Sequence, residues 1–316
     1  MVSLSEHRVR TPFTRLPGSL STNIFPVSWT PTGQVFIAKR FSLQDDRSKR
    51  KYENESLILQ RLQGGKRILT LHHTVHSPTG DGWLLTEQLS GDLLSLVERE
   101  MLQDQTCLWD VFSQICEAVQ YCHQNQVAHL DLKPENIFFR SHEDGRYSIK
   151  LADFGMSRLI ASEAERLVGL HGTVHYSAPE VLTSVTGYQP FKADIWSLGV
   201  TLHVLLTGYW PFLAEDDDEL RYLIAGGQVN VSASLPRFVQ LFIESMLTFD
   251  PNRRPDIHQV IQMLNGLLPK IGVSLRPSSP FLGSSRHPSR SFHVVLEKTL
   301  QWLPFVLFSR TERSSS

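Results

Sequence analysis

The stretch His129-Leu130-Asp131-Leu132-Lys133-Pro134-Glu135-Asn136 is the most informative part of this chain of 316 residues. Asp153-Phe154-Gly155 begins 17 residues after Asn136, and Ala178-Pro179-Glu180 begins 25 residues after Asp153. Upstream, Lys39 ends a strand-like apolar run that starts at Val35. Each short motif alone carries little information, whereas all of them together, in this order, are highly specific.

This ordered set of motifs resembles the eukaryotic protein kinase family over about residues 12–270. The resemblance implies an α+β, two-lobed protein kinase fold, with a small β-rich N-lobe at about 12–88 and a larger α-helical C-lobe at about 89–270. The apolar pattern agrees, because strand-like runs dominate before residue 90 and helical segments dominate after about residue 105. Strands are expected at 35–38 and 83–85, and helices at 46–62, 109–124, 193–206, 220–225, 236–247 and 256–267.

The composition excludes several classes of protein. Hydrophobic residues make up 41% and charged residues 20%, which is typical of a globular protein rather than a collagen-like, coiled-coil or disordered chain. A net charge of −1 provides no global field for nucleic acid, and no apolar run reaches the length of a transmembrane span. Three clustered cysteines and no secretory signal predict a reducing compartment, so cytoplasmic or nuclear residence is expected.

The resemblance implies phosphoryl transfer from ATP, with Mg²⁺, to a hydroxyl of a protein substrate. It assigns Asp131 as the acceptor of the hydroxyl proton and Lys133 as the contact to the transferring phosphate. Asn136 and Asp153 offer hard oxygen ligands, which suit Mg²⁺. Lys133, two positions after Asp131, and Thr173 match the pattern of the serine/threonine branch of the family, so the resemblance implies that the substrate hydroxyl belongs to serine or threonine.

Other positions match the family's nucleotide pocket. The resemblance implies that Lys39 holds the α- and β-phosphates and that Glu55, with Glu53 as the alternative, orients Lys39. The remaining nucleotide-binding positions are the backbone of Glu87 and Leu89 and the side chains of Ile24, Ile37 and Phe138. Two structural roles are also implied: Asp194 braces the catalytic loop, and Glu180 forms a buried ion pair with Arg254.

The chain departs from the family at its phosphate loop. The glycine-rich loop is expected from Pro17 to Ile24, where Gly18 is the single glycine and does not fall on a motif position. Because glycine lets the backbone approach phosphates closely and Pro17 lacks an amide donor, we expect this loop to hold the phosphates less firmly. Ile37, where the family commonly has alanine, adds bulk above the adenine. These losses keep a second interpretation open, a pseudokinase that acts as a scaffold or allosteric binding module.

The activation segment also departs from the family. Leu130 stands where many kinases carry the arginine that pairs with a phosphorylated residue, and Gly169 stands at the usual phosphorylated position. Residues 158–172 contain one hydroxyl, on Ser162. Since both the receptor and the phosphate acceptor are absent, we expect activity without activation-loop phosphorylation, with Glu163 and Glu165 as candidate fixed charges.

Substrate choice and subfamily are less well defined. Asp92 and Glu135 lie where related kinases contact an arginine upstream of the target hydroxyl, so protein substrates with basic residues are expected. The triplet at 129–131 is similar to calmodulin-dependent and myosin light-chain kinases and to some cell-cycle kinases, which leaves the subfamily open. Three histidines, His72, His73 and His76, are expected in a surface loop.

The last part of the chain, residues 271–316, differs in composition from the rest. It contains eleven serines and four prolines, with six basic against two acidic residues, a net charge of 6 − 2 = +4. An apolar segment follows at 294–308. Two interpretations stay open for this segment: a helix that docks on the body, or contact with a membrane surface or a partner.

Overall fold

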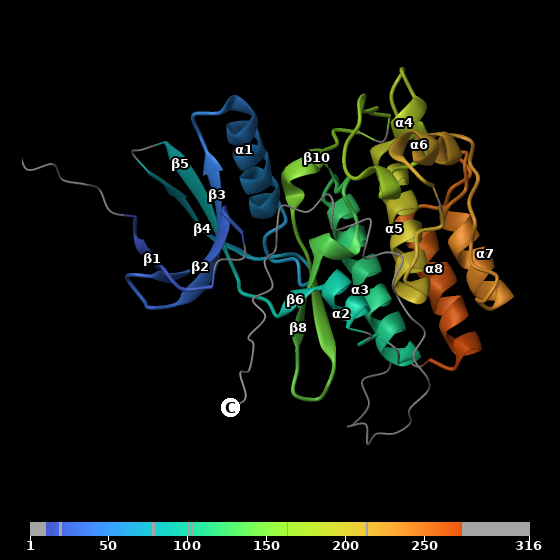
Figure 1. Ribbon diagram of the computed structural model, residues 1–316, viewed down its shortest axis with the longest axis horizontal. Coiled ribbons are helices and arrows are strands. Elements are labelled where there is room, and N and C mark those ends of the chain that lie inside the picture. Colours follow the sequence, from blue (N-terminus) through green and yellow to red (C-terminus); the bar gives the residue numbers. More distant parts are fainter. Residues whose placement is uncertain are drawn as a thin grey trace, which may run out of the picture. The chain divides into compact units, whose positions relative to one another are not determined.

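The computed structural model describes residues 11–18, 21–77, 80–99, 101–102, 104–162, 164–212 and 214–273 (Figure 1). Residues 1–11, which their polar sequence predicts to be a flexible terminus, lie outside the described residues apart from Thr11. Of the tail 271–316, only the first three residues are described, and the apolar segment 294–308 lies outside. The chain forms two compact units. Within the described residues, the first comprises 11–49 together with His72–Gln88, and the second comprises Arg50–Leu71 together with 89–273.

The first unit is built on a five-stranded sheet with the strand order β1-β2-β3-β5-β4. The strands are β1 (Phe13–Arg15), β2 (Ile24–Trp29), β3 (Val35–Ser42), β4 (Leu71–His76) and β5 (Asp81–Thr86). The registers of β1 with β2, β2 with β3 and β3 with β5 are antiparallel. β2 and β3 are joined by a short turn in which Gly33 adopts a left-handed conformation, φ 72°, which favours glycine.

Alternation along β3 separates the two faces of this sheet. Phe36 and Ala38 are buried, whereas Ile37 and Lys39 point to the opposite face, because side chains alternate along a strand. The buried face is an apolar core that also draws on β2, β4 and β5; its members are Phe25, Val27, Phe36, Ala38, Val75, Trp83 and Leu85. The other face is therefore left to carry the polar side chain of Lys39.

The histidines expected in a surface loop lie instead in strand β4, so that prediction is wrong. The ring of His73 stacks on Trp29, with centroids 4.1 Å apart and planes within 5°. The ring of His72 lies 4.8 Å from that of Phe36. Aromatic contact across the sheet stabilises histidine in a strand, although the sequence around it is polar.

The second unit is mainly helical. Its helices are α1 (Asp46–Arg61, from Arg50 onward), α2 (Leu93–Glu98), α3 (Gln105–Gln124), α4 (Pro179–Thr183), α5 (Pro190–Thr207), α6 (Asp217–Ala225), α7 (Arg237–Met246) and α8 (Ile257–Leu267). Its short strands are β6 (Gly91–Asp92), β7 (Val127–Ala128), β8 (Ile137–Ser141), β9 (Tyr147–Leu151) and β10 (Arg158–Leu159). The six helices expected from the sequence are all present, and the α+β class is confirmed.

Helix α1 differs from the expected division of the chain, which placed it in the β-rich part. Most of α1 belongs to the second unit. The amide of Asn54 donates to the carbonyls of Phe154 (3.2 Å) and Ser157 (3.0 Å), and Arg61 Nε donates to the carbonyl of Asn125 (2.8 Å). These hydrogen bonds to residues distant in sequence explain why α1 groups with the helical unit.

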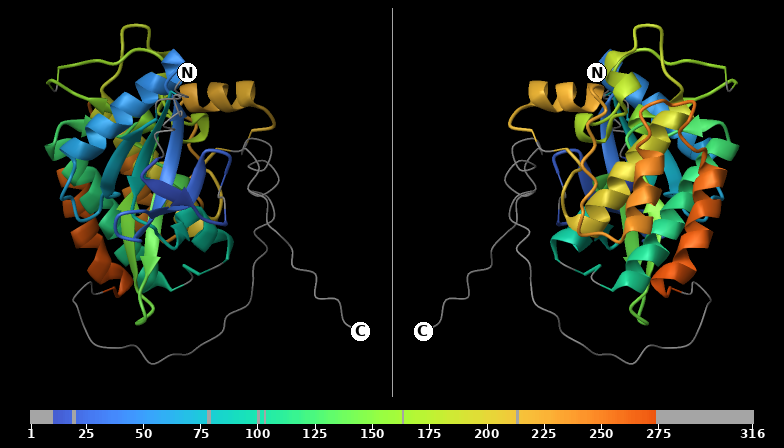
Figure 2. Two further views of the ribbon diagram at one scale, coloured as in Figure 1. Left: turned by 90° about the vertical axis from the view of Figure 1, so that its left-hand side faces the viewer. Right: turned by 90° about the vertical axis from the view of Figure 1, so that its right-hand side faces the viewer.

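Helix α5 is buried along almost its whole length and packs against α3 and α7 (Figure 2). Its buried residues are consecutive from Ala193 to Leu205 and so lie on every side of the helix, as expected for a helix surrounded by others. It ends at Gly208, whose left-handed conformation (φ 76°) closes the last turn. None of the helices in the described part of the chain has the length and apolar character needed to cross a bilayer.

The expected ion pair between Glu180 and Arg254 is confirmed. Arg254 is 1% exposed, and its two terminal nitrogens lie 2.7 and 3.1 Å from the two carboxylate oxygens of Glu180. Its Nε also donates to the carbonyl of Thr248 at 3.0 Å, and its guanidinium lies over the ring of Trp196. Such a fully bonded guanidinium ties α4 to the segment before α8.

Candidate active site

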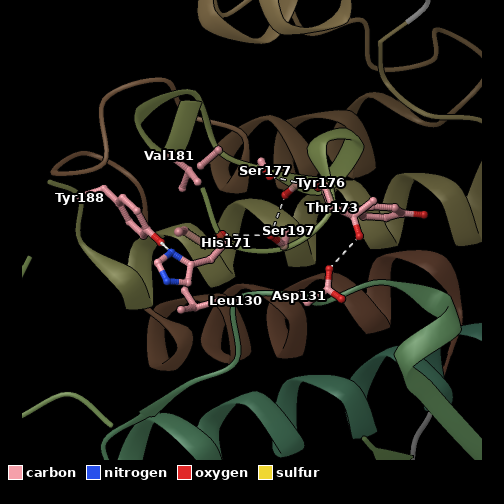
Figure 3. Close-up of a pocket in the computed structure, with 11 residues that line it drawn as sticks. Leu130, Asp131, His171, Thr173, Tyr176, Ser177, Val181, Tyr188 and Ser197 are labelled. Atoms are coloured by element: carbon pink, nitrogen blue, oxygen red, sulfur yellow. Dashed lines mark hydrogen bonds between the residues drawn. The ribbon is translucent and has the colours of Figure 1, made fainter. Parts of the chain in front are cut away.

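Asp131 lies in the loop that follows β7, and polar side chains from this loop and from Thr173 surround its carboxylate. Its Oδ1 accepts a hydrogen bond from Thr173 Oγ1 (2.8 Å), drawn in Figure 3, and its Oδ2 accepts one from Asn136 Nδ2 (2.8 Å). Lys133 Nζ lies 3.2 Å from Oδ2 and donates to Thr173 Oγ1 at 2.7 Å. The structure therefore brings Asp131, Lys133 and Asn136 together and fixes the orientation of the carboxylate.

The carboxylate of Asp194, on α5, binds the backbone of this loop, as expected. The amides of His129 (2.8 Å) and Leu130 (2.7 Å) donate to its two carboxylate oxygens, and His123 Nε2 lies 2.9 Å from Oδ2. Asp194 is fully buried, and Leu130 has a positive φ of 67°. Hydrogen bonds to a charged group contribute about 1.5–3 kcal/mol each, which offsets the cost of a left-handed non-glycine residue.

Asp153 and Glu55 meet at Gly155. Asp153 has a left-handed backbone (φ 56°) and precedes η2 (Phe154–Met156), while Glu55 lies on α1 and is 3% exposed. A Cβ at Gly155 would lie 3.4 Å from Asp153 Oδ1 and 3.5 Å from Glu55 Oε2, so both carboxylates lie against this glycine. Two carboxylates this close are stabilised by nearby positive charge, which an ammonium group or a metal ion supplies.

The donor set fits a hard divalent cation. Asn136 uses its amide nitrogen on Asp131, so its amide oxygen is the atom that a cation would take. Asp153 supplies a carboxylate, and Mg²⁺ is usually bound by one or two such protein oxygens together with phosphates and waters. Among the described residues there is no cluster of three or more His, Cys, Asp or Glu side chains suited to a metal.

One residue of this site was missed by sequence reasoning. Asn54, one position before Glu55, links α1 to the backbone at both ends of η2 through the hydrogen bonds described above. It therefore fixes the segment that carries Asp153. No pattern in the sequence marks this contact, because its partners are backbone carbonyls about a hundred residues further along the chain.

In the first unit, three expected site residues share one face of the sheet. Ile24 is directly opposite Lys39, and Ile37 is opposite Thr86, whose hydroxyl lies 3.4 Å from the Ile37 carbonyl. Lys39 Nζ lies 5.5 Å from the ring centre of Phe41, on the same face. An apolar surface with one ammonium group is suited to a flat ring that carries phosphates.

The other expected nucleotide residues lie after β5. Glu87 follows the end of β5 in the first unit. In the second unit, Leu89 precedes Ser90, whose amide donates to the carbonyl of Phe139 at 2.8 Å. Phe138 lies on β8, opposite Asp92 of β6. Leu89 and Phe138 are therefore joined to one small sheet.

The segment between β1 and β2 occupies the place of the phosphate loop. Ser21 Oγ accepts hydrogen bonds from the backbone amides of Asn23 (3.3 Å) and Ile24 (3.1 Å). These two amides are therefore engaged by a side chain of the loop itself. Gly18 has a positive φ of 93°, as a turn requires.

Two acidic side chains lie near the catalytic loop in an unusual environment. Burial raises the pKa of Glu135 above its usual 4.5, and its Oε2 atom is buried without a hydrogen-bond partner in the described part of the chain. Burial likewise raises the pKa of Asp92, which caps α2 by accepting from the Ser95 amide at 2.9 Å. Their negative charges act on each other, so a cationic group is favoured near them.

Comparison with known proteins connects this geometry to a family. Residues 21–264 match the model of the protein kinase domain. The chain is 30% identical to a cell cycle serine/threonine-protein kinase of Saccharomyces cerevisiae, with 73% of this chain and 33% of the relative covered. It is 34% identical to a serine/threonine protein kinase of Oryza sativa subsp. japonica (72% and 43% covered).

A third relative belongs to the calmodulin-dependent group. It is the calcium/calmodulin-dependent protein kinase type II of Caenorhabditis briggsae, 33% identical, with 73% of this chain and 44% of the relative covered. The chain therefore spans less than half the length of these relatives. Since the domain match covers most of the chain and includes Lys39, Asp131, Asn136 and Asp153, this chain belongs to the protein kinase family, of the serine/threonine type.

Proposed function

We propose that this chain is an active kinase that transfers the γ-phosphoryl group of ATP to serine or threonine hydroxyls of proteins, using Mg²⁺. The observation that carries the proposal is the carboxylate of Asp131, oriented by Thr173 and Asn136 beside the ammonium group of Lys133. Phosphoryl transfer needs positioning and charge neutralisation more than covalent chemistry, and this arrangement provides both.

Each residue has a distinct role in this proposal. Asp131 orients the substrate hydroxyl and accepts its proton, and Lys133 neutralises charge that develops on the transferring phosphoryl group. Asn136 and Asp153 would hold Mg²⁺, which supplies charge neutralisation on the phosphates when bound. Lys39 would bind the α- and β-phosphates.

The proposal is tested by phosphoryl transfer from labelled ATP with Mg²⁺ to a generic basic protein substrate. Asp131→Asn keeps the shape of the side chain but removes the base, so kcat is expected to fall by about 100-fold or more. Asp218→Asn, an exposed position on α6, is the matched control and should keep wild-type activity. Equal transfer by wild type and Asp131→Asn would contradict the assigned role.

We also propose that activity does not depend on phosphorylation of the activation segment. Leu130 is buried and apolar where an arginine would pair with phosphate, and Ser162 is the one hydroxyl within 158–172. Glu165 caps its own segment by accepting from the Ala161 amide at 2.6 Å, whereas Glu163 lies outside the described residues. Ser162→Ala and phosphatase treatment should each leave kcat unchanged, and loss of activity in either would contradict this independence.

A second candidate function is a scaffold without turnover. It is favoured by the hydroxyl of Ser21, which engages two amides of the segment that would otherwise face phosphates. Thermal stabilisation by Mg²⁺ and ATP separates the candidates: stabilisation with no transfer under all activating conditions indicates a nucleotide-binding scaffold. If the wild type transfers phosphate and Asp131→Asn does not, the protein is not a scaffold without turnover.

We propose protein substrates with a basic residue upstream of the target hydroxyl. The support is the pair of partly desolvated carboxylates, Asp92 and Glu135, and the unpartnered Oε2 of Glu135. We compare two peptides, one with an arginine upstream of the serine and one with alanine at that position. The KM of the arginine peptide should be about tenfold lower. A preference for the peptide without arginine would contradict this proposal.

We further propose that the protein acts in the cytoplasm or nucleus. The support is that Cys107, Cys116 and Cys122 are all free thiols, two of them fully buried. Fractionation of cells that carry the tagged protein tests this, and recovery from an oxidising compartment would contradict it.

A further inference from the structure

The segment that carries Thr173 is anchored to Tyr188, at the start of the chain leading into α5. Leu167 and Tyr188 exchange two backbone hydrogen bonds, of 3.1 and 2.9 Å. The preceding Gly187 has a φ of 99°, and a Cβ there would lie 3.0 Å from the Leu167 carbonyl oxygen. The two strands of backbone therefore approach closely at this point.

A side-chain hydrogen bond joins the same two stretches of chain. Tyr188 Oη lies 2.8 Å from His171 Nδ1, and Figure 3 shows the hydroxyl of Tyr188 directed at the His171 ring, with Leu130 on the other side of that ring. Tyr188 is 3% exposed and Leu130 is 6% exposed. Burial, with a smaller effect from the Arg158 charge, lowers the pKa of His171, so its ring is neutral near pH 7.

The next residue fixes the segment against the catalytic loop. Gly172 has a φ of 84°, and a Cβ there would lie 2.2 Å from the carbonyl oxygen of Leu130, so any side chain is excluded. His171 and Thr173 are the two neighbours of this contact. A shift of His171 would therefore be transmitted through Gly172 to the hydroxyl of Thr173, which orients Asp131.

The basic side chain of Arg158, whose charge acts on His171, is hydrogen-bonded within its own segment. Arg158 donates to the carbonyls of Met156 (3.2 Å) and Ser157 (2.8 Å), which lie in its own segment. With Leu130 buried beside His171, the site holds an apolar side chain and a neutral hydrogen bond where an arginine and a phosphate would otherwise pair.

We propose that His171 and Tyr188 are positioning residues for phosphoryl transfer, whose hydrogen bond over Leu130 holds the activation segment so that Thr173 orients Asp131 without phosphorylation. This inference rests on the proposed kinase activity. His171 and Tyr188 themselves touch neither the reacting atoms nor the nucleotide positions named above.

Four variants test the inference. Tyr188→Phe removes the hydroxyl alone, and His171→Leu removes the ring nitrogens. His171→Asn keeps a group with both a donor and an acceptor near the position of Nδ1, so it is the conservative variant. Tyr222→Phe, an exposed tyrosine on α6 (73% exposed), is the matched control.

Two measurements are made on each full-length variant: kcat and KM for ATP and peptide, and amide hydrogen exchange of residues 167–173. Tyr188→Phe should lower kcat by about threefold to tenfold, as expected for one lost hydrogen bond. His171→Leu should lower kcat at least as much, because Nδ1 also lies 3.2 Å from the Gly169 carbonyl oxygen, and KM for ATP should be unchanged in both variants. In both, exchange in 167–173 should rise while exchange in α5 stays as in wild type. His171→Asn should recover most of the activity, and Tyr222→Phe should match wild type.

The outcomes separate this inference from the proposed function. Wild-type kcat and unchanged exchange in Tyr188→Phe would overturn the inference while leaving the kinase activity intact. A higher peptide KM with unchanged kcat would also overturn it, because that indicates substrate docking rather than positioning. If the wild-type protein transfers no phosphate, the proposed function fails and so does the positioning role, whereas the exchange measurement still shows whether the hydrogen bond holds the segment.

Discussion

The buried carboxylate of Glu135 lowers the stability of the folded chain. Its Oε2 is buried without a hydrogen-bond partner in the described part of the chain, and burial raises its pKa. An unsatisfied buried polar group costs about 1–3 kcal/mol, so the folded chain gains nothing from the charge itself. The arrangement is explained if a cationic substrate side chain supplies the missing partner.

Glu135→Gln should therefore raise stability and weaken substrate binding at once. We expect a gain of up to about 1 kcal/mol in the free energy of unfolding, measured by urea denaturation, because the burial of a charge is relieved. KM for an arginine-containing peptide should rise by about tenfold, while KM for the matched alanine peptide should not change.

The raised pKa also predicts a pH effect on this residue. The Glu135 carboxylate takes up its proton at a higher pH than an ordinary glutamate of pKa 4.5. The protonated side chain carries no charge to attract arginine. The preference for the arginine peptide should therefore weaken as the pH is lowered, before an ordinary glutamate would be protonated. A preference that persists in Glu135→Gln, or that strengthens in acid, would show that other groups bind the arginine.

At the scale of elements, the helical unit depends on contacts that join the ends of helices. Arg254 connects the segment before α8 to Glu180 of α4 and to the carbonyl of Thr248, and it is almost completely buried. A buried ion pair adds little compared with an apolar pair of the same shape, but the loss of one partner leaves an uncompensated charge.

Arg254→Met should lower the free energy of unfolding by about 3–5 kcal/mol, because Glu180 then keeps a charge without its partner. The double variant Arg254→Met/Glu180→Leu should recover part of this loss. The exposed pair Arg237–Glu244 on α7, 2.8 Å apart, is the control, and Arg237→Met should cost less than about 1 kcal/mol. Equal costs at the two sites, measured by urea denaturation, would contradict this view.

For the whole molecule, buried histidines make stability depend on pH. His203 of α5 is 2% exposed. Its Nδ1 lies 2.8 Å from the Tyr209 carbonyl, which requires the proton on Nδ1, and its Nε2 then accepts from the Ser232 amide at 3.2 Å. Burial lowers the pKa of His203, since a charged ring would lose this acceptor and its hydration.

The free energy of unfolding should therefore decrease as the pH falls below 6.5. The unfolded chain binds a proton at that pH while the folded chain does not, and the decrease should level off below the folded pKa. His203→Leu should be less stable at pH 7.5, because the Ser232 amide loses its acceptor, but should show a smaller slope between pH 7 and about 5.5. An unchanged slope would mean that other groups, such as His171, account for the effect.

The sequence by itself determined the family and the α+β class, and it predicted which residues form the catalytic loop. His129–Asn136, Asp153–Gly155 and Ala178–Glu180 are local motifs whose spacing is visible along the chain. The helices could be predicted because apolar residues recur with helical periodicity, as in α3 and α8. The brace by Asp194 and the pair of Glu180 with Arg254 followed from the resemblance, and both are present.

Only the tertiary structure decided which distant groups meet. Asn54 bonds to the carbonyls of Phe154 and Ser157, and His171 bonds to Tyr188. His73 lies in a strand, where its ring stacks on that of Trp29. The physical reason is that such contacts depend on the direction of backbone carbonyls and on ring packing between segments, and these are set when the chain packs rather than by any periodic pattern of residues.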